Sequence, residues 1–239
     1  MTFIPKVYEP DTNKQDVYDN KAPFRKLDDL FLVSKHVKYK ELTQIAPDIW
    51  VIDESLPSDI CDKMIDRFES EKRTYQGSTG GGVNKDIKDS KDFMLPHNEE
   101  SYKELDDEFF KSLNHGVNAV REQVSWYLQR HLKGFDFDTG YQIQKTTPGG
   151  KYVWHTEVEG CASMNRTLTF LWYLNDEGIK GGETGFARQG VKVQPRKGRL
   201  VLFAPYWTHV HAGLPLEEGV KYIATGWIHA QVSEEWFKR

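Results

Sequence analysis

Only two cysteines occur among the 239 residues, Cys61 and Cys161, and they lie far apart in the sequence. A disulfide framework is therefore excluded, and a reducing compartment is the simpler expectation, with one disulfide between the two as the alternative. Long apolar runs are also missing, since runs such as Leu168–Leu174 are far too short to cross a bilayer. The opening residues MTFIPKVYEPDTNKQD contain no apolar segment typical of a signal peptide. These absences predict a cytoplasmic protein that is not held in a membrane.

The sequence has no excess of basic residues, because its formal net charge is −4. A mildly acidic chain has no general attraction to phosphate backbones, so nucleic acid is a poor default partner. Hydrophobic residues make up 38% and aromatic residues 13% of the sequence, enough to build a core. Nothing in the composition indicates global disorder, and nothing in it predicts an oligomeric state.

The N-terminal part of the sequence predicts an arm followed by helices. Residues 1–45 are polar with scattered aromatics, and we expect an arm that packs on a single domain at 46–239. Helical support is predicted over 58–132, where apolar residues recur at helical spacing. Ser58 is a candidate N-cap of the first helix, and Gly116 a candidate break in a second helix that runs from Tyr102 to Leu132.

After residue 138 the pattern changes to short apolar or alternating runs separated by glycine and proline turns. Many short strands with regular turns predict a mainly β core over 138–230, built as a sandwich or barrel with flanking helices. The run Leu168–Leu174 is apolar on both faces. One face is therefore expected to line the sandwich interior and the other to be covered by the upstream helices.

A candidate metal site begins at His155 and Glu157, because residues two apart in a strand point to the same face. A histidine from a distant strand would complete a two-histidine, one-carboxylate triad, which suits Fe(II) and leaves coordination positions open. Further along, Lys221 shares a strand face with Ile223, Thr225 and Trp227. A lysine that points into a sandwich interior needs an anion there, and a dicarboxylic acid chelating the metal at its other end would supply one.

The region from Tyr141 to His229 resembles the prolyl 4-hydroxylase-like branch of the Fe(II)- and 2-oxoglutarate-dependent oxygenases. The matching blocks are PGGKYVWHTE, RTLTFLWYLND, GGETGF and HAGLPLEEGVKYIATGW. In that family the distal metal histidine lies four residues before a proline and ten before a lysine, and His211, Pro215 and Lys221 have both spacings. The resemblance implies a double-stranded β-helix core of the jelly-roll or cupin type, within an α+β domain.

The resemblance also implies the cofactors and the roles of site residues. Fe(II) would be bound by His155, Glu157 and His211, and Lys221 would bind the co-substrate 2-oxoglutarate. Thr169 and Trp227 are expected to line the co-substrate pocket. O2 would be the oxidant, with ascorbate as a candidate reductant.

Two departures from the family pattern bear on the substrate. The acidic ligand is Glu157 where most relatives have aspartate, and Thr146 stands where prolyl hydroxylases often have a tyrosine that bonds the co-substrate. We therefore expect a hydroxylase that acts on a C–H bond of a peptide or amino-acid-like substrate and releases succinate and CO2. The alternatives are a non-catalytic jelly-roll binding module, or an oxygenase that acts on another small molecule or on nucleic acid.

His209 is the rival of His211, because the two share a strand face. We interpret His209 as a residue that supports a ligand or faces the substrate, with plain packing as the alternative. Residues 76–92 are rich in glycine and charge, and they predict a mobile loop. The hypothesis drawn from this loop is a lid that closes over a polar substrate, and the alternative is an idle surface loop.

Overall fold

The computed structural model describes residues 42–124, 135–160 and 163–230. Most of the predicted arm, residues 1–45, lies outside these ranges, as does the C-terminal end of the predicted second helix. The arm and the boundary at residue 46 therefore stay predictions. The last residues of the predicted arm enter strand β1, Thr43–Ala46, which pairs with β2, Ile49–Ile52.

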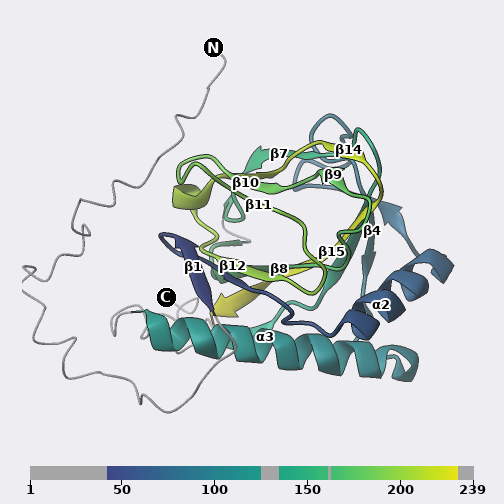
Figure 1. The fold of residues 1–239 in the computed structure, drawn as a ribbon, viewed down its shortest axis with the longest axis horizontal. Helices are drawn as coiled ribbons and strands as arrows, with labels where there is room; N and C mark the ends of the chain where they lie inside the picture. The colour runs from purple at the N-terminus through teal and green to yellow at the C-terminus, as the bar shows by residue number, and fades with distance from the viewer. Residues whose placement is uncertain (1–41, 125–134, 161–162, 231–239) are drawn as a thin grey trace, which may run out of the picture.

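The fold is two facing antiparallel sheets with helices on one outer side (Figure 1). The larger sheet has nine strands in the described residues, in the order β1-β2-β12-β8-β15-β6-β4-β3, with β5 also paired to β15. Besides β1 and β2, its strands are β3 Tyr75–Gln76, β4 Lys91–Met94, β5 Phe135–Asp138, β6 Gln142–Thr146, β8 Arg166–Tyr173, β12 Leu200–Phe203 and β15 Lys221–Ala230.

The smaller sheet has four strands in the order β11-β10-β13-β7, and a two-stranded ribbon of β14 and β9 lies beside it (Figure 1). The bounds of these strands are β7 Tyr152–His155, β10 Thr184–Phe186, β11 Val191–Val193, β13 His211–Gly213, β9 Lys180–Gly181 and β14 Leu216–Glu218. Two sheets of this kind form the jelly-roll, double-stranded β-helix core that the sequence predicted.

Two helices cover the outer face of the larger sheet (Figure 1). Helix α2 spans Ser58–Ser70, and α3 spans Lys103–Gln123 after the 3-10 turn η1, Glu100–Tyr102. The predicted N-cap is wrong by one position, because Pro57 occupies the cap without a side-chain hydrogen bond and Ser58 is already helical.

The predicted break at Gly116 is also wrong, since α3 continues through this residue. A Cβ atom at Gly116 would lie 2.5 Å from Cδ2 of Leu200 and 3.1 Å from Cδ1 of Leu202. The glycine therefore serves close packing of the helix on β12, rather than ending the helix.

The central strands are apolar on both faces, as Leu168–Leu174 predicted. Phe170 and Trp172 of β8 pack with the helices, whereas Leu171 and Tyr173 pack between the sheets. Alternation sends successive side chains to opposite faces, so one run of residues serves two cores.

Candidate metal centre and co-substrate pocket

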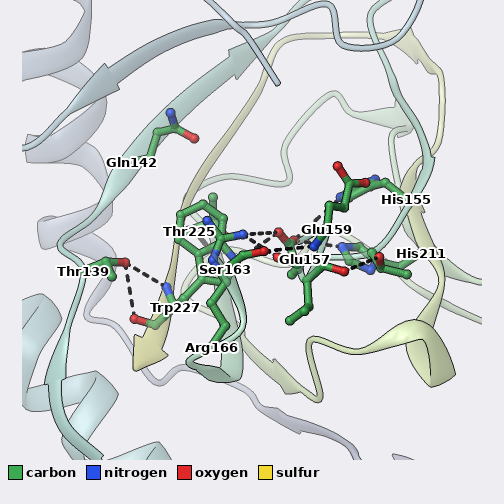
Figure 2. Close-up of polar contacts among 12 residues, drawn as sticks. Thr139, Gln142, His155, Glu157, Glu159, Ser163, Arg166, His211, Thr225 and Trp227 are labelled. Carbon is green, nitrogen blue, oxygen red and sulfur yellow. Dashed lines mark hydrogen bonds and ion pairs between the residues drawn. The ribbon is translucent and has the colours of Figure 1, made fainter. Parts of the chain in front are cut away.

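The two predicted histidines and the glutamate converge at one point between the sheets. His155 lies at the end of β7, His211 lies opposite it on β13, and Glu157 follows β7 (Figure 2). The ligand atoms of the three residues all lie within 4.8 Å of one another. Nε2 of His211 is 3.1 Å and Nε2 of His155 is 3.6 Å from Oε1 of Glu157.

Strand geometry explains only part of this convergence. Strand β7 ends at His155, so Glu157 is not in the extended strand that the sequence predicted. Its backbone N–H instead donates to the carbonyl of Pro205 at 3.0 Å, which holds the turn after the strand against the segment following β12. The pairing of β7 with β13, a contact between distant parts of the chain, brings His211 to the other two residues.

Both imidazoles are oriented by backbone carbonyls. Nδ1 of His155 lies 2.7 Å from the carbonyl oxygen of Val153, and Nδ1 of His211 lies 2.9 Å from that of His209. Each Nδ1–H therefore donates to the backbone, and each Nε2 is left to face Glu157. Two imidazole nitrogens and one carboxylate that face a common point fit the donor set of a non-haem Fe(II) centre.

The carboxylate of Glu157 is held from its other side by residues of the larger sheet. The indole N–H of Trp227 donates to Oε2 at 2.9 Å (Figure 2). Arg166 donates to the backbone carbonyl of Glu157 at 2.5 Å, and its guanidinium stacks over the indole ring at 3.6 Å. Oε1 is thus left to face the histidines while Oε2 is anchored.

The charge of Glu157 is stabilised despite its burial. Burial alone would raise the pKa of the carboxyl, but hydrogen bonds and charge from His155 and His211 outweigh that effect and hold the pKa well below its usual range. The residue is therefore a carboxylate, the form that binds a metal.

Two of the residues at this site were missed when the sequence was interpreted. The ring of Tyr152 stacks on the imidazole of His155 with centroids 3.5 Å apart and planes inclined by 17°. The signal for Tyr152 was its position in YVWHTE beside the metal motif, whereas the contact of Arg166 with Glu157 depends on tertiary structure.

Lys221 is buried at the start of β15, where only 5% of it is exposed. Its ammonium donates to the carbonyl of Gly182 at 2.6 Å, and no ion pair satisfies it in the described part of the chain. Burial lowers the pKa of Lys221 to about 8, with the charge of Glu183 opposing that shift. A buried lysine without a counter-ion is suited to binding an anion.

One cavity of about 430 Å³ joins the triad to Lys221. Its lining includes the metal residues together with Thr146, Thr184, Ile223, Thr225 and Trp227. Thr169 does not line this cavity: its side chain is buried and its hydroxyl has no hydrogen-bond partner. Both Trp227 and Thr169 were expected to line the co-substrate pocket, and Trp227 does line this cavity. Thr169 is paired with Trp227 on β8 but is not among the lining residues.

His209 does not join the triad. Its Nε2 lies 3.0 Å from the carbonyl of Pro47 and its Nδ1 lies 2.9 Å from the hydroxyl of Thr208. Of the alternatives for His209, a supporting role fits best, since its backbone carbonyl orients His211 while its ring packs away from the cavity.

The segment 76–92 differs from the mobile loop that its composition predicted. The N–H of Asp89 donates to Lys151 O, and the N–H of Val153 donates to Ile87 O, both at 2.9 Å. These bonds connect the segment to β7 while its last residues form β4 in the larger sheet. The segment therefore connects the two sheets at one side of the cavity. Its composition did not predict this, because backbone hydrogen bonds rather than apolar burial hold the segment in place.

Comparison with known proteins agrees with this geometry. Residues 141–229 match the family described as the 2OG-Fe(II) oxygenase superfamily. A stretch of 147 residues is 29% identical to probable prolyl 4-hydroxylase 4 of Arabidopsis thaliana, and it covers 47% of this chain and 48% of the relative. The prolyl 4-hydroxylase subunit alpha-1 of Bos taurus is 30% identical over 136 residues, or 49% of this chain and 25% of the relative. The chain thus spans about half or less of the length of these relatives.

Two solved structures share the fold. A viral collagen prolyl hydroxylase from Paramecium Bursaria Chlorella virus-1, in complex with 2OG, superposes with a TM-score of 0.57 and 23% identity over 79% of this chain and 100% of its own. A prolyl hydroxylase from Trichoplax adhaerens, bound to a hypoxia inducible factor peptide fragment, gives a TM-score of 0.60 and 19% identity over 77% of this chain and 84% of its own.

Residues 141–229 of the β core therefore match the 2OG-Fe(II) oxygenase superfamily, and the relatives that this chain resembles are named as prolyl 4-hydroxylases. His155, Glu157 and His211 form the metal-binding triad of that core. In the described ranges no helix has both the length and the apolar character required to span a bilayer.

Proposed function

We propose that the chain is an Fe(II)- and 2-oxoglutarate-dependent dioxygenase that hydroxylates a C–H bond of a peptide or amino-acid-like substrate. The observation that carries this proposal is one cavity that contains both the His155, Glu157 and His211 triad and the buried Lys221. A metal centre alone would also fit a binding module, but a buried cation in the same cavity requires an anionic partner.

In this proposal His155, Glu157 and His211 bind Fe(II), and Lys221 pairs with the distal carboxylate of 2-oxoglutarate. When bound, the metal and co-substrate supply oxidation by O2, with 2-oxoglutarate converted to succinate and CO2 as the substrate gains a hydroxyl group. The chain positions the two imidazoles through the bonds to Val153 O and His209 O.

The substrate class is inferred from two kinds of support. The curated relatives are named as prolyl 4-hydroxylases, and one structural relative is bound to a peptide fragment. The cavity also has polar walls beyond the co-substrate end, including Gln142, Gln144 and Thr225. Thr146 still argues that co-substrate binding differs in detail from the tyrosine-assisted pattern.

A succinate-release assay with Fe(II), 2-oxoglutarate and a panel of peptides and amino acids tests the proposal. Wild-type protein should release succinate in a substrate-dependent manner, and His155→Ala and His211→Ala should lose both Fe(II) binding and turnover. His97→Ala is the matched control, because His97 pairs with Asp106 near the helices and not with the triad. Fe(II) binding without any consumption of 2-oxoglutarate would instead support the non-catalytic module.

A further inference from the structure

A cluster of buried polar side chains lines the cavity wall formed by β4 and β6. Only 4% of Lys88, 8% of Ser90, 0% of Asp92 and 9% of Gln144 is exposed. Asp92 and Gln144 are direct neighbours across the two strands. Burying these groups costs free energy that an apolar wall would avoid, so a stability role explains them poorly.

The hydrogen bonds within the cluster satisfy the carboxylate but not the other groups. Lys88 and Ser90 donate to the two oxygens of Asp92, each at 2.7 Å. Gly77 covers the carboxylate, because a Cβ atom there would clash with Ser90 Oγ and lie 3.2 Å from Oδ2 of Asp92. Asp92 is therefore sealed from the cavity, whereas Lys88 and Gln144 line it.

Among the cluster residues that line the cavity, Lys88 has unused N–H donors and Gln144 has an unused carbonyl acceptor. An ammonium has three N–H donors, and Asp92 is the only hydrogen-bond partner of the Lys88 ammonium in the described segments. The side-chain amide of Gln144 donates to Oε1 of Gln142 at 2.7 Å, so its own carbonyl oxygen stays open. Gln142 is itself held by a bond to the hydroxyl of Tyr75 at 3.2 Å.

The charge of the wall selects between possible ligands. Lys88 is already neutralised by Asp92, so the wall as a whole has no charge left for an anion. An N–H donor beside a carbonyl acceptor matches an uncharged amide, which offers one C=O and at least one N–H. A carboxylate would meet the open carbonyl of Gln144 unfavourably.

The wall is also close to the metal centre. The ammonium of Lys88 lies 5.5 Å from the ring centroid of Tyr152, and that ring stacks on His155. A group bound beside Lys88 would therefore be separated from the candidate metal ligand His155 by the ring of Tyr152. Lys221 lines the same cavity from β15, where it pairs with Thr146, two residues beyond Gln144 on β6.

We propose that Lys88 and Gln144, held by Asp92, Ser90 and Gln142, form a subsite that binds an uncharged amide group of the substrate, either a peptide bond or a carboxamide. This inference rests on the proposed function, because it names the substrate group that the same cavity accepts. Lys88 would donate to the amide carbonyl, and the Gln144 carbonyl would accept the amide N–H.

A binding experiment tests the subsite without iron or turnover, so it can be interpreted even if the proposed function fails. The probes are N-methylacetamide, the matched ester methyl acetate, which has no N–H, and acetate. NMR would follow the side-chain amide signal of Gln144 and the Cε signal of Lys88 in labelled protein. The amide should shift both signals saturably and bind about threefold to tenfold more tightly than the ester, the effect of one net hydrogen bond.

Variants identify the residues responsible. Gln144→Leu, followed at Lys88, should remove the preference for amide over ester. Lys88→Met combined with Asp92→Asn, followed at Gln144, should do the same without leaving a buried charge unpaired. Lys91→Met is the matched control, because Lys91 lies on the same strand with its side chain exposed, and it should bind as wild type. Circular dichroism would verify that each variant is folded.

The outcomes are decisive in both directions. Tighter amide binding that is lost in both test variants and kept in the control supports the subsite. Equal binding of amide and ester, tighter binding of acetate, or an amide preference that survives Gln144→Leu would overturn it.

Discussion

The indole N–H of Trp227 donates to Oε2 of Glu157 at 2.9 Å, while Oε1 of the same carboxylate faces the two metal histidines. The two oxygens thus have separate tasks, one anchored to the protein and one directed to the metal position. A glutamate side chain has one more rotatable bond than aspartate, so it needs such an anchor to present a single oxygen.

Trp227→Phe should therefore weaken metal binding without removing a ligand. The phenylalanine ring keeps the wall under Arg166 but has no N–H donor, and loss of an outer partner of this kind costs about tenfold in metal affinity. Titration with Fe(II) under nitrogen measures the change. Trp207→Phe, at an exposed tryptophan, is the control, and an unchanged affinity in Trp227→Phe would show that the anchor is dispensable.

His209→Ala should retain the metal but lower stability. The backbone carbonyl that orients His211 survives the substitution, whereas the ring contacts with Pro47 and Thr208 are lost. The free energy of unfolding should fall by about 1–3 kcal/mol, since a buried carbonyl loses its partner. Chemical denaturation measures the change in stability, and titration with Fe(II) measures metal binding. Loss of Fe(II) binding in His209→Ala with retention in His211→Ala would reverse the ligand assignment.

Lys221→Met should weaken 2-oxoglutarate binding by about tenfold to a hundredfold while Fe(II) affinity stays the same, because a charge-assisted bond is removed. Isothermal titration with 2-oxoglutarate at fixed metal concentration measures this. If the co-substrate binds equally well to the variant, its distal carboxylate is held elsewhere in the cavity.

The same substitution should also change how stability depends on pH. Burial lowers the pKa of Lys221 from 10.5 to about 8, so the folded chain binds fewer protons than the unfolded chain between these values. Without co-substrate, the buried charge of Lys221 therefore lowers the free energy of unfolding of the wild-type protein below pH 8. This destabilisation disappears as the pH rises to 10.5. The stability advantage of Lys221→Met over wild type is the difference between their free energies of unfolding. This advantage should be about 3 kcal/mol larger at pH 7 than at pH 10.5. A difference that does not vary with pH would mean that Lys221 keeps its proton.

Limited proteolysis should distinguish a bridge from a mobile loop in segment 76–92. Trypsin should cut the folded protein after Lys85, whose side chain is 65% exposed, and spare Lys88, whose side chain is 5% exposed. The two lysines are three residues apart in one segment, so each is the control for the other. Cleavage at both with equal rates would restore the lid hypothesis.

The sequence by itself determined most of the local elements and predicted the three residues that the fold brings together as a candidate metal site. The nearly continuous apolar run Leu168–Leu174 predicted a strand buried on both faces, and the family-like spacing of His211, Pro215 and Lys221 singled out one histidine from two. These signals are short-range, because periodicity and motif spacing are properties of neighbouring residues.

Only the tertiary structure decided what surrounds those ligands. Trp227 reaches Glu157 and Tyr152 stacks on His155 because strand pairing and turn geometry set those distances. The composition of segment 76–92 predicted mobility, yet Lys88 and Asp92 are buried there, because backbone bonds to β7 and pairing with β6 hold the segment in place. A polar segment predicts that little apolar surface will be buried. It does not predict which hydrogen-bond and charge partners the rest of the fold provides for that segment.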